Sequence, residues 1–118
     1  MKRDMDLIRQ LLLDIENEPF DGKYHAWQLP ERSESELCYH AQLASEAGLI
    51  EAKFLNGTTA FRIKRLTYEG HEFLDAARDQ NRWAKAKDTV LAKTGTLTVE
   101  ALKVALGFLI NKAMTGGM

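Results

Sequence analysis

The stretch LIEAKFLNGTTAFRIK, residues 49–64, decides the fold of this chain. Apolar and polar side chains alternate from Leu49 to Leu55, which is typical of a strand with one buried face. Asn56-Gly57 follows, and this dipeptide is the strongest short hairpin signal because both residue types accept the positive φ angles of a tight turn. The alternation resumes from Thr58 to Lys64. The stretch therefore predicts a two-stranded antiparallel hairpin.

Two helices and a short strand are predicted before the hairpin. The first helix has apolar residues at helical spacing and should end near Pro19. Residues 24–29 alternate weakly and predict one short strand, which Pro30 ends. Ser33 or Ser35 is expected to cap the second helix, which runs to about Ala47. Leu37, His40, Ala41 and Ala44 should form its inward face.

Two more helices are predicted after the hairpin. Thr67 is expected to cap a long third helix that reaches Lys93, with Gly95 as its stop. A last helix should begin at Thr96 or Thr98 and is apolar nearly all round. The chain is thus expected to be α+β and mostly helical. It should consist of one domain over residues 1–93 and a C-terminal helix and tail over residues 94–118, packed on that domain or at a dimer interface.

The order of these elements is helix, short strand, helix, hairpin and long helix. This is the order of a winged helix-turn-helix, in which the hairpin is the wing and the helix before it is the recognition helix. Residues 30–33 leave room for at most one helical turn. The separate second helix of the usual motif is therefore expected to be missing or degenerate.

Five short motifs carry a resemblance to a known family. They are MKRDMDLIR at residues 1–9, YH at 39–40, AGLI at 47–50, LTYEGHEFLD at 66–75 and WAK at 83–85. They resemble the small bacterial and prophage proteins grouped as domain of unknown function 2513, over residues 1 to about 93. The resemblance implies a winged-helix fold and a phage or mobile-element context. It implies no established activity and supplies no functional residues.

Charge limits the ways in which the chain could contact nucleic acid. Sixteen basic and 17 acidic residues give a formal net charge of −1, so bulk positive charge cannot drive binding. Residues 53–65 nevertheless carry four basic residues and no acid, whereas residues 14–36 carry seven acids against two basic residues. A local basic wing is therefore predicted beside an acidic start of the recognition helix.

Two function hypotheses follow. In the first, the chain is a DNA-binding transcriptional regulator of prophage or mobile-element origin that contacts double-stranded DNA. Ser35, Tyr39 and Gln42 would face base edges. Phosphate would be held by Lys53, Asn56, Thr58, Arg62 and Lys64. In the second, the winged helix is an interaction module for a protein partner and does not bind DNA; the neutral charge balance and the acidic helix start favour this alternative.

The last helix predicts a homodimer. A helix that packs on one side of a small domain needs only one apolar stripe, and this helix carries more than one. A second exposed stripe would be unfavourable in water, so a symmetric partner is expected to cover it. The residues expected at this interface are Leu102, Leu106, Phe108, Leu109 and Ile110.

No enzyme, cofactor or metal site is predicted. The three histidines lie in different elements without metal-ligand spacing, and no phosphate-binding or nucleophile motif is present. His40 lies on an apolar face and is expected to be a core histidine bonded to a carbonyl group or to a side chain. A single cysteine, Cys38, fits a reducing cytoplasm. The most apolar stretch, residues 104–110, is far shorter than the ~20 residues of a membrane span, so no membrane contact is expected.

Overall fold

The computed structural model describes residues 1–116, which form five helices and one two-stranded antiparallel sheet. The chain divides into two compact units, Met1–His71 and Glu72–Met118. The expected α+β class is confirmed. Each unit has its own set of buried apolar side chains and is described separately below.

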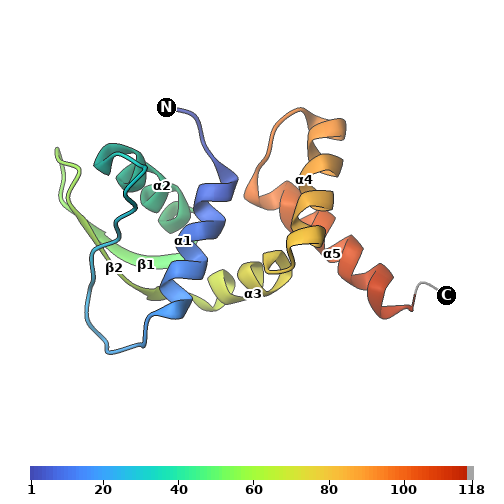
Figure 1. Ribbon diagram of the computed structural model, residues 1–118, viewed down its shortest axis with the longest axis horizontal. Helices are drawn as coiled ribbons and strands as arrows, with labels where there is room; N and C mark the ends of the chain where they lie inside the picture. Colours follow the sequence, from blue (N-terminus) through green and yellow to red (C-terminus); the bar gives the residue numbers. More distant parts are fainter. Residues whose placement is uncertain (117–118) are drawn as a thin grey trace. The chain divides into compact units, whose positions relative to one another are not determined.

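The first unit contains two helices and the hairpin (Figure 1). Helix α1 spans Met5–Asn17 and helix α2 spans Glu34–Glu46, where the sequence placed them. The Oδ1 atom of Asp4 caps α1 by accepting from the Asp6 and Leu7 amides, and the hydroxyl of Ser33 caps α2 by accepting from the Glu36 amide. Helix α1 packs against α2 and the second strand, and α2 packs against the first strand.

The hairpin consists of β1, Ile50–Phe54, and β2, Phe61–Leu66. Lys53 lies opposite Arg62 in the ladder. A bulge next to Glu51 leaves Lys64 without a residue directly opposite it in the ladder register. The turn is longer than the dipeptide signal predicts, because the Leu55 amide donates to the Ala60 carbonyl across residues 56–59. The second strand therefore begins at Phe61 and not at Thr58.

The predicted strand over residues 24–29 is wrong in its extent. Only His25 pairs with the sheet, through two 2.8 Å backbone hydrogen bonds with Ile63. The segment then turns inward at Trp27, whose indole N–H donates to the Asp14 carboxylate at 2.9 Å. A buried aromatic ring held by a side chain of α1 takes the place of further ladder bonds.

A close backbone approach joins the end of α2 to the start of α3, Tyr68–Ala77. The Thr67 amide donates to the Leu49 carbonyl, and the Thr67 hydroxyl accepts from the Gly70 amide. A Cβ atom on Gly70 would collide with the carbonyl oxygen of Leu49. Glycine is therefore required here for lack of space, and Thr67 caps the helix as predicted.

The long third helix predicted from Thr67 to Lys93 is wrong, because two helices occupy this range. Helix α3 ends at Ala77, and helix α4 spans Gln80–Thr94. Asp79 takes an extended conformation between them, and its carboxylate accepts from the Arg82 amide. An aspartate before a helix-forming run is a strong N-cap, and this local preference outweighs the continuous apolar pattern.

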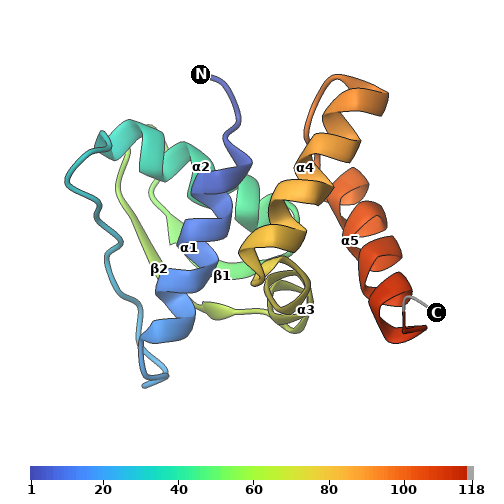
Figure 2. The ribbon, with the colours of Figure 1, turned by 45° about the vertical axis from the view of Figure 1, so that its right-hand side comes forward.

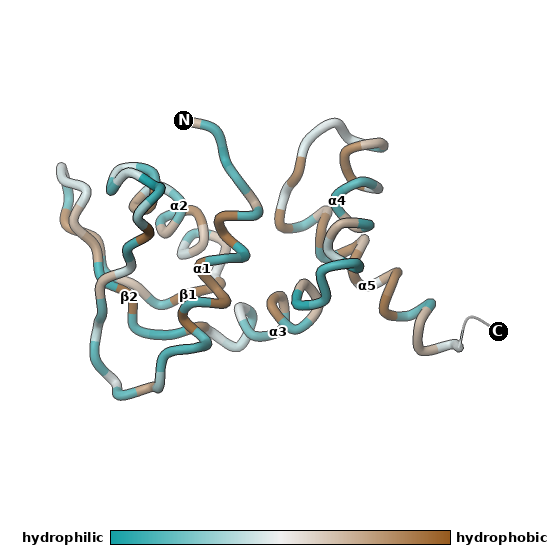
Figure 3. The backbone as a smooth tube through the Cα atoms, in the orientation of Figure 1, coloured by the Kyte–Doolittle hydropathy of each residue, from teal (hydrophilic) through white to brown (hydrophobic). Residues whose placement is uncertain are grey.

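The second unit is completed by α5, Val99–Met114, which lies alongside α4 (Figures 1 and 2). Thr98 caps α5 and Gly95 ends α4 with a φ of 77°, both within the predicted bounds. Trp83 is fully buried and packs edge-to-face on Phe73, with ring centroids 6.2 Å apart. Figure 3 shows the apolar stretches that recur along α1 and α5.

Replacing Gly70 by alanine should lower the free energy of unfolding by about 1–3 kcal/mol, since the new methyl group must displace the Leu49 backbone. Gly107, inside α5, is the matched control, because a Cβ atom there meets nothing within 4 Å. Gly107→Ala should stabilise its helix by up to about 1 kcal/mol. Denaturant unfolding of both variants measures the difference. Equal effects would contradict the close contact at Gly70.

Candidate nucleic-acid interface

Basic side chains gather on the outer face of the hairpin. Lys53 on β1 and Arg62 on β2 are both exposed and directly opposite each other. Cross-strand neighbours of this kind have Cβ atoms about 4.5–5.5 Å apart, so two like charges repel there. The hairpin thus holds two cations side by side on a rigid surface, an arrangement that stability alone disfavours.

Glu51 neutralises the other two cations of the hairpin. Its carboxylate accepts from Arg65 Nε at 2.7 Å and lies 3.9 Å from the ammonium group of Lys64. The hydrogen bond from Arg65, with the nearby positive charges of Lys64 and Arg65, lowers the pKa of Glu51 below its ordinary value. The local charge of the hairpin is therefore smaller than residues 53–65 alone suggest.

Tyr24 belongs to this cluster, although sequence reasoning did not select it. The ammonium group of Lys53 lies 4.5 Å from the centre of its ring, and that of Lys64 lies 5.6 Å from it. Its hydroxyl donates to the Glu51 carboxylate at 3.5 Å. The aromatic character of residues 24–29 was the available signal, but only the His25 bridge brings this residue to the hairpin face.

The tip of the hairpin is polar and fixed by Thr58. Its hydroxyl donates to the Leu55 carbonyl at 2.9 Å and accepts from the Ala60 amide at 3.0 Å. Asn56 and Thr58 are both exposed, as a phosphate contact requires. The Thr58 hydroxyl, however, already has two backbone partners, and the Thr58 amide donates to the Leu55 carbonyl, so both groups are less available to a phosphate than their exposure suggests.

Helix α2 presents an acidic outer face. Ser35 is exposed, and Tyr39 and Gln42 are half-buried. The helix contains no lysine or arginine between Glu34 and Glu46, and both of these glutamates are exposed. A major-groove reader would approach phosphate with this face, so the local charge opposes the residues selected for base contacts.

His40 fixes the position of α2 against α1. The imidazole is fully buried; its Nδ1 atom donates to the Glu36 carbonyl at 2.8 Å, and its Nε2 atom accepts from the Asp4 amide at 2.9 Å. Arg32 reinforces the same junction, at 3.0 Å from Glu36 and 3.4 Å from Asp4. The expected core histidine is confirmed, and of the two expected kinds of partner, a carbonyl group or a side chain, the structure has the Glu36 carbonyl.

Within residues 1–116 the cysteine and histidine side chains are not gathered into a metal site. Cys38 is only 4% exposed; burial first, and then the charge of Glu34, raises the pKa of its thiol. Among residues 1–116 no group of three or more histidine, cysteine, aspartate or glutamate side chains is arranged to hold a metal ion.

The residues predicted at a dimer interface lie on opposite sides of α5. Leu102 and Leu106 are fully buried within the chain, so they are unavailable to a second copy. Phe108 is 67% exposed, and Val104, one turn earlier, is 75% exposed. Leu109 and Ile110 are half-buried. In the part of the chain that the structure describes, α5 and the other helices are all too short or too polar to cross a membrane.

These features define a small α+β protein in which a basic hairpin follows an acidic helix. The chain belongs to the family described as "Hypothetical protein (DUF2513)", whose family model matches residues 2–96, so the resemblance is confirmed. A protein of Haemophilus influenzae described as "Uncharacterized protein" is 31% identical over 120 residues, covering 97% of this chain and 99% of that protein. No solved structure matches the chain.

Replacing Glu51 by glutamine should make the hairpin less stable at neutral pH and its stability less sensitive to acid. A lowered carboxyl pKa contributes stability that is fully present above the unfolded pKa and is lost as the pH falls through the folded value. The wild-type protein should therefore lose hairpin stability between about pH 5 and pH 3, and Glu51→Gln should lose less. Hydrogen exchange of the hairpin amides across this pH range measures the loss of stability in both proteins.

Glu46→Gln, which removes an exposed carboxylate of α2 instead, is the matched control and should leave the acid dependence of the hairpin unchanged. Identical acid profiles for Glu51→Gln and the wild type would contradict the role of Glu51.

Proposed function

We propose that the chain is a winged-helix protein that binds double-stranded DNA, with the β1–β2 hairpin as its wing, and acts as a transcriptional regulator of prophage or mobile-element origin. The order α1, His25 bridge, α2, β1 and β2 supports this fold, because the bridge stands where a winged helix has its first strand. The regulatory role rests on the frequent use of this scaffold to bind DNA, which is an argument from fold alone.

The observation that carries the proposal is the exposed pair of Lys53 and Arg62. Two facing cations destabilise a hairpin slightly, and a phosphate group placed between them would relieve the repulsion. Asn56 at the tip adds a neutral donor beyond the pair. Lys64 forms an ion pair with Glu51 and would contribute less than its sequence position suggests.

Helix α2 would supply sequence preference in this proposal. Gln42 and Tyr39 are partly exposed, and a glutamine side chain can pair with the edge of adenine through two hydrogen bonds. Glu34 and Glu46 would keep this face at a distance from phosphate groups and lower the affinity for duplex in general. The protein is thus expected to bind weakly and to depend on the wing.

Reversing the charge of the pair, with Lys53→Glu and Arg62→Glu together, should weaken binding to every duplex and reduce the salt dependence. Each lost phosphate contact lowers the slope of log K against log salt by about 0.9, so the double variant should lose a slope of about 2. Fluorescence anisotropy of a labelled duplex over a salt series measures both quantities.

The matched control is Lys85→Glu with Lys93→Glu, the same change in net charge placed on α4 in the other unit. It should leave the slope unchanged. Gln42→Ala should cost about 1–3 kcal/mol, but only on a preferred sequence. If the wild-type protein shows no duplex binding at low salt, or if both double variants behave alike, the wing does not bind DNA.

A second candidate function is a protein-interaction module, and the acidic face of α2 favours it. Glu34 and Glu46 flank Ser35, Tyr39 and Gln42 without any basic residue on the helix. Such a face suits a basic protein partner and repels duplex. This candidate predicts no duplex binding even at low salt, so the same titration separates the two functions.

The proposal includes a homodimer formed through the outer face of α5. Val104 and Phe108 lie one turn apart and are both mostly exposed, on the side opposite the buried Leu102 and Leu106. Covering two large apolar side chains removes an unfavourable contact with water, at about 25 cal/mol per Å² of apolar area.

Val104→Asp with Phe108→Asp should convert the dimer into a folded monomer, because a charge cannot be buried unpaired at such an interface. Leu55→Asp is the matched control, since Leu55 is an exposed apolar residue of the hairpin tip in the other unit. Sedimentation equilibrium at tens of micromolar distinguishes the species. A monomeric wild-type protein under these conditions would refute the dimer.

A further inference from the structure

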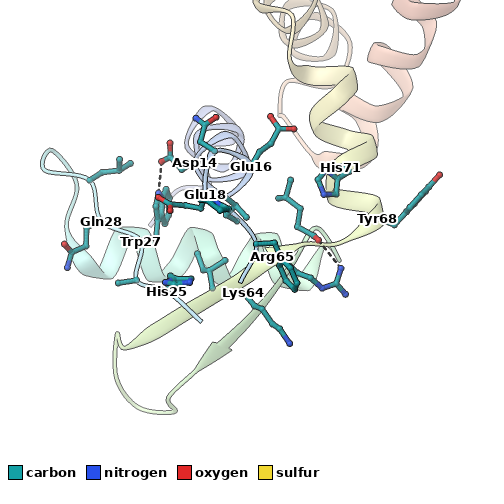
Figure 4. A pocket seen from close by; sticks show the side chains of 18 residues that line it. Asp14, Glu16, Glu18, His25, Trp27, Gln28, Lys64, Arg65, Tyr68 and His71 are labelled. Carbon is teal, nitrogen blue, oxygen red and sulfur yellow. Dashed lines mark hydrogen bonds between the residues drawn. The ribbon is translucent and has the colours of Figure 1, made fainter. Parts of the chain in front are cut away.

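The first unit contains a groove whose lining includes neither the Lys53–Arg62 pair nor any residue of α2. It has a volume of about 930 Å³ and lies between the carboxyl end of α1, the segment around Trp27, strand β2 and the start of α3 (Figure 4). All of its lining residues belong to Met1–His71. Binding pockets for small molecules fall in the range of about 300–1,000 Å³, so the groove is large enough for one.

The floor of the groove is apolar, and two aromatic side chains stand at its rim. Trp27, Ile63 and Leu66 are core residues whose edges line it. Phe20 and Tyr68 also line it and are 69% and 74% exposed. Large aromatic side chains exposed beside a hollow are unfavourable in water, and a flat apolar molecule in the groove would shield them.

One wall of the groove carries negative charge. Asp14, Glu16 and Glu18 all line it from the last turn of α1 and the residue after it. This turn contains no basic residue, so the negative end of the helix dipole is not offset within the turn and adds to the negative charge of Glu18. The wall therefore favours a cation over an anion or a neutral molecule.

The basic residues that line the groove do not cancel this charge. The charged ends of Lys64 and Arg65 bind Glu51, and Figure 4 shows the Lys64 side chain directed away from α1. The ring of His25 binds the Asp21 carboxylate at 2.9 Å. His71, on α3, is the fourth lining side chain that can carry a positive charge, and it is exposed to solvent.

From this geometry we infer that the groove binds a small organic cation with a flat apolar body and a primary ammonium group. The body would lie on Trp27 and against Phe20, and the ammonium group would face Glu18 and the last carbonyl groups of α1. The indole N–H of Trp27 is already donated to Asp14, so the floor offers the body an apolar surface and no free donor there. An ammonium group has three donors and matches a wall of acceptors.

Three probes that share an indole ring but differ in the charge of their side chain test whether the groove prefers a cation. Tryptamine carries an ammonium group, tryptophol a hydroxyl group and indole-3-acetate a carboxylate on the same indole ring. Titration of the ¹⁵N-labelled full chain should shift the indole N–H signal of Trp27 with tryptamine, while that of Trp83, buried in the other unit, stays unchanged. Tryptamine should bind on the order of tenfold more tightly than indole-3-acetate, with tryptophol between them.

Variants of the chain then locate the site. Glu18→Gln should weaken tryptamine binding about two- to fivefold, the effect of one partly exposed charge pair, and leave tryptophol binding unchanged. Phe20→Ala should weaken the binding of both tryptamine and tryptophol. Glu46→Gln, on α2 and outside the groove, is the matched control and should change neither. Equal affinity for the three probes, shifts that spare Trp27, or no shift at millimolar tryptamine would each overturn the inference, whatever the result of the DNA titration.

Discussion

The first unit depends on one buried imidazole. His40 lies on α2, but its two ring nitrogens bond to the Glu36 carbonyl within α2 and to the Asp4 amide that precedes α1. Both partners are backbone groups, so the ring acts as a fixed spacer between two helix ends and not as a flexible side-chain contact. An apolar residue of similar size would fill the space but leave the Asp4 amide without this partner, at a cost of about 1–3 kcal/mol for a buried group. The direction of α2, and with it the outward placement of Ser35, Tyr39 and Gln42, follows from this bond pair.

Charge in the first unit is sorted by element. The carboxylates of α1 and α2 lie at helix ends and on outer faces, where Asp4 and Glu36 also bind Arg32. Four cations, Lys53, Arg62, Lys64 and Arg65, lie on the hairpin, where Glu51 is the acid among them. This separation gives a nearly neutral chain one basic and one acidic surface, which is why net charge alone says so little about its partners. The function proposed for the hairpin and the ligand class inferred for the groove are both consequences of this local sorting.

The parts of the fold that sequence reasoning predicted are those set by short-range chemistry. Ser33, Thr67 and Thr98 are helix caps, and the alternation around Lys53 and Arg62 forms the hairpin. The errors arose where a local preference and a longer pattern disagree: Asp79 starts a new helix inside an apolar stripe, and Trp27 leaves the sheet to reach Asp14. The candidate interface was predicted as a basic run, but the pairing of Lys64 and Arg65 with Glu51 requires the bulge and the register, which periodicity does not specify. The groove depends on how residues 18–29 cross the end of α1, and no local signal encodes that path.

The buried thiol of Cys38 can report the opening of α2 without any added label site. Cys38 is the single cysteine, it is buried on α2 as His40 is, and its surroundings disfavour the thiolate. An alkylating reagent attacks the thiolate, so modification has to wait until the helix separates from its neighbours. The rate of labelling under native conditions thus measures the free energy of that opening, in the same way that hydrogen exchange measures it for backbone amides. No engineered residue is needed, and labelled and unlabelled molecules differ in mass at one known position.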